Sequence, residues 1–303
     1  MAPKRTQARI DAVEAAAGGA GVHDSNGAVD ASPPTVEAPG DESVRAFAER
    51  YPSLTFAPVV VVIPAFNEAD AIGAVLPRVP RESCRLAVDA LVVDHGSADG
   101  TGEVAGSLGA YVARLAKNSG QGSALRLGYR LARERGARFI VTLDADGQWD
   151  PADVHELLRP VVDDEADLVL GSRKLGRAET TDSVRRLGVH VFARVLRVLT
   201  GVPITDTSSG VRAMRVEVTS TVRQVEPQYQ ATELLIGAIY HGYRTAERPV
   251  VMHKRVAGTS KKGHNALYGL RYGRVMLRTW WRESRAAKRA GRRPAARPPD
   301  SRR

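Results

Sequence analysis

Two aspartates one residue apart, Asp144 and Asp146, directly follow a short apolar run at residues 139–143. In an extended chain, side chains two positions apart project to the same side, so the two carboxylates can act on one ligand. A pair of hard oxygen donors of this kind suits Mg²⁺ or Mn²⁺ bound together with phosphates. A solvated aspartate turn before a helix has the same composition, and only the placement after an apolar strand favours the metal-binding interpretation.

Two further segments could bind an anion. Residues 117–122 read Lys-Asn-Ser-Gly-Gln-Gly and precede a predicted helix, whose first N–H groups attract negative charge. Leu125 stands where a dinucleotide fingerprint has its third glycine, so this loop is better explained as a helix cap, and no P-loop sequence occurs elsewhere. Residues 255–261 read Arg-Val-Ala-Gly-Thr-Ser-Lys and follow a predicted strand at 244–251. This cationic segment could close over a diphosphate and neutralise a leaving group, or it could be an exposed basic turn.

The elements that must position these residues alternate between strands and helices. Apolar runs predict strands at 59–63, 90–93, 111–113, 139–143 and 168–170, and helical patterns predict helices at 69–76, 101–108, 122–135 and 152–158. This alternation predicts an α/β fold with a doubly wound, mostly parallel sheet. Ligands bind such sheets at the carboxyl ends of the strands, where four polar clusters follow here, at 64–68, 94–101, 144–148 and 171–173. Turn chemistry alone would not account for all four.

Composition excludes several classes of protein. With 43% hydrophobic residues in 303, the chain can bury a sizeable core, and its single cysteine, Cys84, excludes an internal disulfide framework and fits a reducing compartment. The longest apolar runs, such as 59–63, are far shorter than the roughly 18 residues that span a bilayer, and no secretory signal is evident. Residues 278–303 carry eight of the ten net positive charges, so the basic character belongs to the tail rather than to a folded nucleic-acid-binding face.

Six motifs occur in order: Pro64 to Glu68, Asp94 to Thr101, Asp144 to Gln148, Gly171 to Arg173, Asp206 to Arg212 and Arg255 to Lys261. Together, over about residues 58–265, they resemble the GT-A-fold family 2 glycosyltransferases, and within them the dolichol- or polyprenyl-phosphate mannose synthases. The resemblance implies a single GT-A catalytic domain at 58–265. Composition predicts a disordered extension at 1–57, with a short helix around 42–50, and a disordered basic tail at 291–303.

The resemblance also implies roles for individual residues. The residues that it implies for donor binding are Pro64, Phe66, Glu68, Val93, Asp94, His95, Asp144 and Ala145. It implies that Asp144 and Asp146 bind the metal and that Gln148 can add a ligand. The cations that contact the diphosphate or the acceptor phosphate are Arg173, Arg255 and Lys261, and the acceptor phosphate is also assigned to Arg185 and Arg212. His95 departs from the family, which has a second aspartate there, and because imidazole cannot accept hydrogen bonds as a carboxylate does, the choice between GDP and UDP stays open.

A basic, aromatic helix is expected at 266–290. At 100° per residue, Arg271, Arg274, Arg278 and Arg282 fall on one stripe, and Tyr272, Met276, Leu277 and Trp280 lie largely away from it. Such a helix, followed by a basic tail, is typical of a segment that lies in an anionic membrane interface. The alternative is that its aromatic face packs on the sheet and leaves the arginines solvated.

These observations predict a metal-dependent enzyme, peripheral on the cytoplasmic face of the membrane. It would move a mannose- or glucose-type sugar from a nucleotide diphosphate sugar to polyprenyl phosphate. A phosphate acceptor is already largely ionised and needs orientation by cations, such as Lys261 and Arg255 closing over the site. A hydroxyl acceptor would instead need a carboxylate base, for which Asp206 and Glu233 are candidates. The alternatives are a soluble family 2 enzyme acting on a small hydroxyl acceptor, and a non-catalytic protein that uses its basic tail on nucleic acid or membrane; no nucleic-acid partner is expected.

Overall fold

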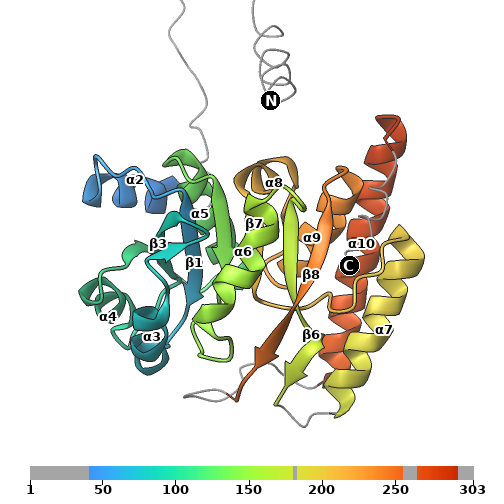
Figure 1. Cartoon of the computed structure of the whole chain (residues 1–303), viewed down its shortest axis with the longest axis horizontal. Helices are drawn as coiled ribbons and strands as arrows, with labels where there is room; N and C mark the ends of the chain where they lie inside the picture. Colours follow the sequence, from blue (N-terminus) through green and yellow to red (C-terminus); the bar gives the residue numbers. More distant parts are fainter. Residues whose placement is uncertain (1–40, 180–182, 255–264, 293–303) are drawn as a thin grey trace, which may run out of the picture. The chain divides into compact units, whose positions relative to one another are not determined.

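The computed structural model describes residues 41–179, 183–254 and 265–292 of the chain, all within one compact unit. An eight-stranded sheet runs through it in the order β2-β3-β1-β5-β7-β6-β8, and β4 also pairs with β3 (Figure 1). The strands are β1 (Val59–Ala65), β2 (Glu82–Ser83), β3 (Leu86–Asp94), β4 (Tyr111–Arg114), β5 (Phe139–Thr142), β6 (Leu168–Ala178), β7 (Arg212–Arg215) and β8 (Thr245–Met252).

The sheet is mostly parallel. Strand β1 pairs in parallel with β3 and β5, β4 with β3, and β8 with β6, whereas β7 runs antiparallel between β5 and β6 and the short β2 antiparallel to β3. The predicted doubly wound, mostly parallel α/β sheet is therefore confirmed. The five residues Val59 to Ile63 are wholly buried, and alternate ones belong to the two opposite cores, as the two-residue period of a strand requires.

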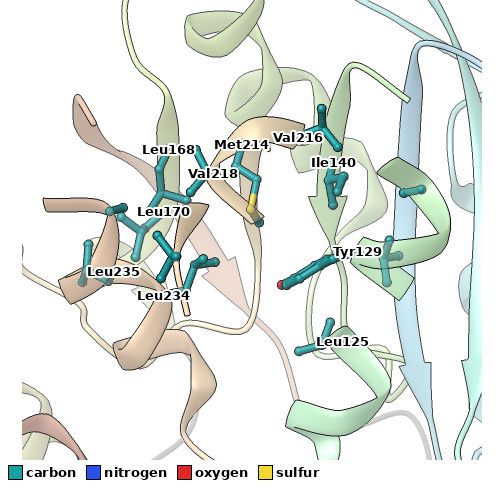
Figure 2. Close-up of a cluster of buried hydrophobic side chains, with 14 of the residues drawn as sticks. Leu125, Tyr129, Ile140, Leu168, Leu170, Met214, Val216, Val218, Leu234 and Leu235 are labelled. Carbon is teal, nitrogen blue, oxygen red and sulfur yellow. The ribbon is translucent and has the colours of Figure 1, made fainter. Parts of the chain in front are cut away.

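Helices cover both faces. The helices are α2 (Asp41–Arg50), α3 (Ala69–Val75), α4 (Thr101–Ser107), α5 (Gln121–Glu134), α6 (Val154–Val162), α7 (Ser183–Thr200), α8 (Val216–Thr221), α9 (Gln230–Tyr240) and α10 (Asn265–Arg289), with short 3₁₀ turns η1 (Leu76–Arg78) and η2 (Pro151–Asp153). One core contains residues of α3, α4 and α6, and the other contains residues of α2, α5, α8, α9 and α10. Figure 2 shows part of the second core, where Leu125 and Tyr129 of α5 face Leu234 and Leu235 of α9.

Residues 41–57 belong to the folded unit, which corrects the predicted boundary at residue 57. Phe47 on α2 is 2% exposed and Phe56 is 4% exposed, and both lie in the second core. The short helix expected around 42–50 is present as α2. Residues 1–40 and 293–303, which hold most of the predicted disordered extension and tail, lie outside the described residues.

Helices α7 and α10 lie side by side (Figure 1). The rings of Phe192 and Tyr272 are 4.6 Å apart, and further along both helices Trp280 Nε1 donates a hydrogen bond of 3.0 Å to the carbonyl of Leu199. The two helices therefore run in the same direction. The face of α10 that carries Tyr272 and Met276, expected in a membrane interface, is buried against α9 and α7 instead. No helix in the described ranges has the length and hydropathy to cross a membrane.

Candidate active site

A cavity of about 440 Å³ opens at the carboxyl ends of the central strands, at the edge of the sheet where the four polar clusters were expected. The predicted residues that line it are Pro64, Phe66, Glu68, His95, Asp144, Ala145, Asp146, Gln148, Arg173 and Arg212. Its walls also include Asn118 of the loop at 117–122 and residues that the sequence did not single out for the site, among them Trp149, Tyr229, Gln230 and Tyr272. Strand ends from the first half of the chain thus meet α9 and α10 around one space.

Hydrogen bonds tie the segment after β1 to the segment after β3. Asn67, which has a positive φ of 50°, donates its backbone N–H to Ser97 Oγ, and the backbone N–H of Glu68 donates to Thr101 Oγ1. Asp94 is wholly buried and accepts the backbone N–H of Ser97 at 2.8 Å. Asp94 therefore shapes the loop behind the cavity, and Val93 lies in the core, so neither is among the residues that line the cavity, and their predicted donor contacts stay predictions.

His95 forms one wall of the cavity together with Phe66, whose ring lies 5.3 Å away. His95 Nδ1 lies 3.1 Å from Asn118 Oδ1, and that oxygen also accepts the backbone N–H of Gly120 at 2.9 Å. The amide oxygen of Asn118 can only accept hydrogen bonds. The facing Nδ1 of His95 must therefore be the donor, which means that Nδ1 carries the proton. The loop at 117–122 is therefore part of the cavity wall as well as the start of α5.

Asp144 and Asp146 both face the cavity. Asp144 accepts hydrogen bonds from Gln121 Nε2 at 2.8 Å and from Trp149 Nε1 at 3.0 Å, one on each oxygen, and a Cβ on Gly210 would lie 2.1 Å from Asp144 Oδ2. Only glycine at position 210 leaves room for this carboxylate. Asp146 is 7% exposed and accepts the backbone N–H of Gln148.

This donor set fits a divalent cation that is shared with a phosphate ligand. Among the described residues no group of three or more His, Cys, Asp or Glu side chains could hold a metal by itself. Mg²⁺, however, is usually held by one or two carboxylates, with waters and substrate phosphates completing the octahedron. Asp144 and Asp146 match that arrangement, and Gln148 lines the cavity beside them with its amide nitrogen 3.3 Å from the carbonyl of His253.

Arg173 lines the cavity and forms a two-point ion pair with Asp206. Its Nε and Nη2 donate to the two oxygens of Asp206 at 2.6 and 2.7 Å, and Nη2 also donates to Ser208 Oγ. Asp206 is wholly buried. The geometry therefore disfavours Asp206 as a base, because the residue is enclosed and both of its oxygens orient Arg173.

Glu233, the other candidate base, is also fully engaged and wholly buried. Its Oε1 accepts from Arg282 Nη1 at 3.0 Å, and its Oε2 accepts the backbone N–H groups of Val225 and Glu226. Glu233 is thus the partner of Arg282 on α10. Among the described lining residues, the carboxylates that remain are Glu68, Asp144 and Asp146.

Arg212, at the start of β7, is the residue whose charge the fold leaves unbalanced. It is 2% exposed, its Nη2 makes a long 3.4 Å bond to the carbonyl of Ser209, and its Nε and Nη1 have no hydrogen-bond partner among the described residues. Tyr129 on α5 and Gln230 on α9 are buried as well, and the Tyr129 hydroxyl interacts with both Gln230 and Arg212. Burial raises the pKa of the Tyr129 hydroxyl, so it is a neutral donor at physiological pH. Because a buried unpaired charge is costly, this region is suited to an anionic ligand.

Three predicted residues cannot be placed. Arg255 and Lys261 lie outside the described residues, as does the side chain of Arg185, although its backbone belongs to α7. Arg271 of α10, noted in the sequence only as part of a basic stripe, lines the cavity. Tyr229 and Gln230 follow no strand, and no sequence pattern marked them.

Comparison with known proteins agrees with the arrangement of the site. The family described as glycosyl transferase family 2 matches residues 60–223. The dolichyl-phosphate hexose transferase of Haloferax volcanii is 34% identical over 205 residues, which cover 68% of this chain and 87% of that protein. The polyprenol monophosphomannose synthase of Mycolicibacterium smegmatis is 33% identical over 214 residues, which cover 67% and 80%.

The fold has solved counterparts as well. Glucosyl-3-phosphoglycerate synthase from Mycobacterium tuberculosis, crystallised with Mn²⁺, UDP and glucosyl-3-phosphoglycerate, superposes with a TM-score of 0.57. The match covers 79% of this chain and 83% of that one at 21% identity, and it shows a shared GT-A fold. With more than half of its length matched by the family and its sheet, carboxylate pair and cavity arranged in this way, the chain belongs to glycosyl transferase family 2 and is a glycosyltransferase.

Proposed function

We propose that this enzyme transfers a mannose- or glucose-type sugar from a GDP- or UDP-sugar to a polyprenyl phosphate. Two relatives with about one third of their residues identical are named for transfer to dolichyl phosphate or for making a polyprenol monophosphate sugar. The observation that carries the proposal is the cavity itself, which presents a carboxylate pair and a buried, unpartnered arginine and whose two candidate bases are occupied elsewhere.

The donor binds along the first half of the cavity. Phe66 and His95 would contact the base, and Pro64 and Glu68 line the same wall. Asp144 and Asp146 would hold Mg²⁺ or Mn²⁺, which supplies charge neutralisation for the diphosphate that leaves the sugar. Arg173 adds a positive charge that Asp206 already holds in place, so the side chain does not have to reorient during the reaction. Arg255 and Lys261 stay proposed as cations that close over the diphosphate.

The acceptor is proposed to be a phosphate because the cavity presents cations, and because the carboxylates that line it, Glu68, Asp144 and Asp146, are assigned to the donor and the metal. A phosphate monoester carries nearly two negative charges at neutral pH, so its oxygen needs orientation and not deprotonation. Arg212 would bind this phosphate from the floor and Arg271 from α10, and Arg185 stays a proposed third contact. A hydroxyl acceptor would need a base within hydrogen-bond reach, and Asp206 and Glu233 are enclosed by their arginine partners.

An enzyme with a lipid-linked acceptor works at a membrane surface, and we place this one on the cytoplasmic face as a peripheral protein. The alternative, a soluble enzyme with a small hydroxyl acceptor, would be active without lipid and would show a bell-shaped pH dependence. A lipid phosphate acceptor predicts product that partitions into organic solvent and a rate without a base-controlled limb near neutral pH.

The central test replaces Asp146 with alanine and measures transfer of radiolabelled sugar from GDP- and UDP-sugars into lipid extract. We expect at least about a 100-fold loss of metal-dependent transfer, since one of two carboxylates that hold the cation is gone. Asp163→Ala, at an exposed aspartate after α6, is the matched control and should transfer at the wild-type rate. Undiminished transfer by the Asp146→Ala enzyme, with its thermal midpoint unchanged, would contradict the metal role.

A further inference from the structure

Helix α10 exposes a second apolar stripe on the side away from its buried face. Leu270 is 73% exposed, Leu277 51% and Trp281 53%. These positions are seven and four residues apart, so they lie on one stripe of the helix. Tyr272, Met276 and Glu283 occupy the opposite, buried side. The exposed stripe is therefore additional to the face that holds α10 on the domain.

Helix α7 carries a matching stripe. Val191 is 49% exposed and Val198 79% exposed, one helical heptad apart. Each directly precedes a residue that contacts α10, because Phe192 packs on Tyr272 and Leu199 accepts from Trp280. On both helices the exposed residues thus lie beside the α7–α10 contact, on the side turned away from the core. We call these five residues, Val191, Val198, Leu270, Leu277 and Trp281, the α7/α10 surface; they are five of the eight large apolar side chains that are exposed in the described chain.

The exposed charges around the α7/α10 surface have one sign. The exposed basic side chains described on these helices are Arg194, Arg197, Arg271, Arg274, Arg278, Arg285, Lys288 and Arg289. Glu283 is the one acidic residue in the sequence of either helix, and it is 5% exposed and bonded to Arg282. The guanidinium of Arg285 lies 3.9 Å from the ring centre of Trp281, so the exposed indole is flanked by a cation.

Apolar side chains, an exposed tryptophan and uniformly positive charge together match an anionic bilayer. Leucine, valine and indole enter the region between head groups and acyl chains, while arginines contact the lipid phosphates. A neutral protein partner would leave these arginines unmatched, except for Arg278, which lies 3.6 Å from Glu226. Three consecutive residues then connect this surface to the active site, since Leu270 points outward, Arg271 lines the cavity, and Tyr272 is buried with its hydroxyl bonded to Thr207.

We propose that the α7/α10 surface docks on an anionic bilayer and thereby sets the Arg271 end of the cavity at the depth of a membrane-borne phosphate. The identity of that phosphate as the acceptor rests on the proposed function, whereas the docking itself does not. The membrane contact uses two helices, and the face of α10 that contacts lipid is the one opposite to its Tyr272–Met276 face.

The test is flotation of the full-length protein with vesicles of phosphatidylcholine alone or of equal parts phosphatidylcholine and phosphatidylglycerol. We expect binding to the anionic vesicles that weakens with salt, and about tenfold weaker binding for Leu277→Glu. Arg274→Ala should weaken it about fivefold, the loss of one charge contact with anionic lipid. Leu108→Glu, a change of the same kind at a leucine that is 43% exposed after α4, is the matched control and should bind like wild type. Equal binding of the Leu277→Glu and wild-type proteins would overturn the proposal.

Tryptophan fluorescence gives a second readout. Trp149 is 4% exposed and Trp280 is partly buried, so a blue shift on adding anionic vesicles reports Trp281 and should vanish in Trp281→Phe. If light scattering instead showed a dimer that Leu277→Glu converts to monomer, with no vesicle binding by wild type, the surface would be a contact between two copies and the proposal would fail.

Transfer assays separate this inference from the proposed function. With polyprenyl phosphate in vesicles and a water-soluble short-chain isoprenyl phosphate as parallel acceptors, Leu277→Glu should lower the ratio of the two rates about tenfold. Vesicle binding without any sugar transfer would refute the proposed function and leave the docking intact. If Leu277→Glu transferred sugar to both acceptors with the same ratio of rates as wild type, the docking would be refuted and the proposed function would stand.

Discussion

Arg212 shows how a single residue can be kept for binding at the expense of stability. Its guanidinium is buried at the cavity floor, and no described carboxylate balances its charge. Other buried ionic groups nearby, Asp206 with Arg173 and Glu233 with Arg282, are fully paired. An unpaired buried charge costs free energy of folding, so its role must lie in what the cavity binds.

Arg212→Gln should lower kcat/KM for the phosphate acceptor about 100-fold, equivalent to about 2.7 kcal/mol of transition-state stabilisation. The thermal midpoint should not fall, because the substitution removes an unbalanced charge from the interior. Steady-state kinetics and calorimetry on the same preparation check both parts.

The control for this prediction is Arg215→Gln on the same strand. Arg215 is paired with Asp164 and Asp167 at the far end of β7, away from the cavity, so its loss should leave kcat/KM near the wild-type value. If Arg212→Gln lowered the midpoint by several degrees and the acceptor kinetics changed no more than in Arg215→Gln, Arg212 would be a structural residue.

At the scale of elements, the turn that follows the carboxylate pair carries an acid in an unfavourable setting. Asp150 caps η2 by accepting the backbone N–H of Ala152, and Asp153 follows at the start of α6. Burial, with a further contribution from Asp150, raises the pKa of Asp153 to about 6. One oxygen of Asp153 is buried without a hydrogen-bond partner. This turn therefore prefers a neutral side chain at position 153.

The stability of the protein should report that preference. Because the folded pKa of Asp153 lies above its unfolded value, the contribution to stability is fully present below pH about 4 and is lost as the pH rises through about 6. At about pH 7.5, Asp153→Asn should therefore unfold at a higher urea concentration than wild type, with a free energy of unfolding that is larger by about 1 kcal/mol after allowance for the partial exposure of Asp153. Near pH 4 the two proteins should be equally stable. A difference that is the same at both pH values would show that the amide acts through packing instead.

At the scale of the whole molecule, α2 closes one end of the second core. Phe47 contacts the ring of Tyr51 at 4.8 Å and that of Phe56 at 6.2 Å, and the guanidinium of Arg135 lies 5.8 Å from its ring centre. Arg135 also donates to the carbonyl of Tyr51, which ties the segment after α2 to the end of α5. The folded unit thus extends further towards the N-terminus than the family match at residues 60–223.

Phe47→Ala should lower the free energy of unfolding by about 3–5 kcal/mol, because a fully buried aromatic ring leaves a cavity behind. Val225→Ala, at a valine that is 43% exposed, should change it by less than about 0.5 kcal/mol. Urea denaturation of both variants measures the contrast. A loss below about 1 kcal/mol for Phe47→Ala would mean that α2 is only loosely attached.

The sequence determined the sheet and the location of the site. A run such as Val59 to Ile63 must be buried on both faces, and the order of strands and helices places polar segments at one edge, because both signals are local along the chain. It missed α7 and β7: β7 is a four-residue strand that starts with an arginine, and α7 is rich in valine and arginine.

The tertiary structure decided which charges are available in that site. Asp206 and Glu233 both qualify as bases by composition, but arginines 33 residues before and 49 residues after them in the chain enclose their carboxylates. The contact between Glu233 and Arg282 also joins α10 to α9 on the buried side of α10. Pairing between segments so far apart depends on how helices pack on the sheet, and no local pattern of residue types encodes it.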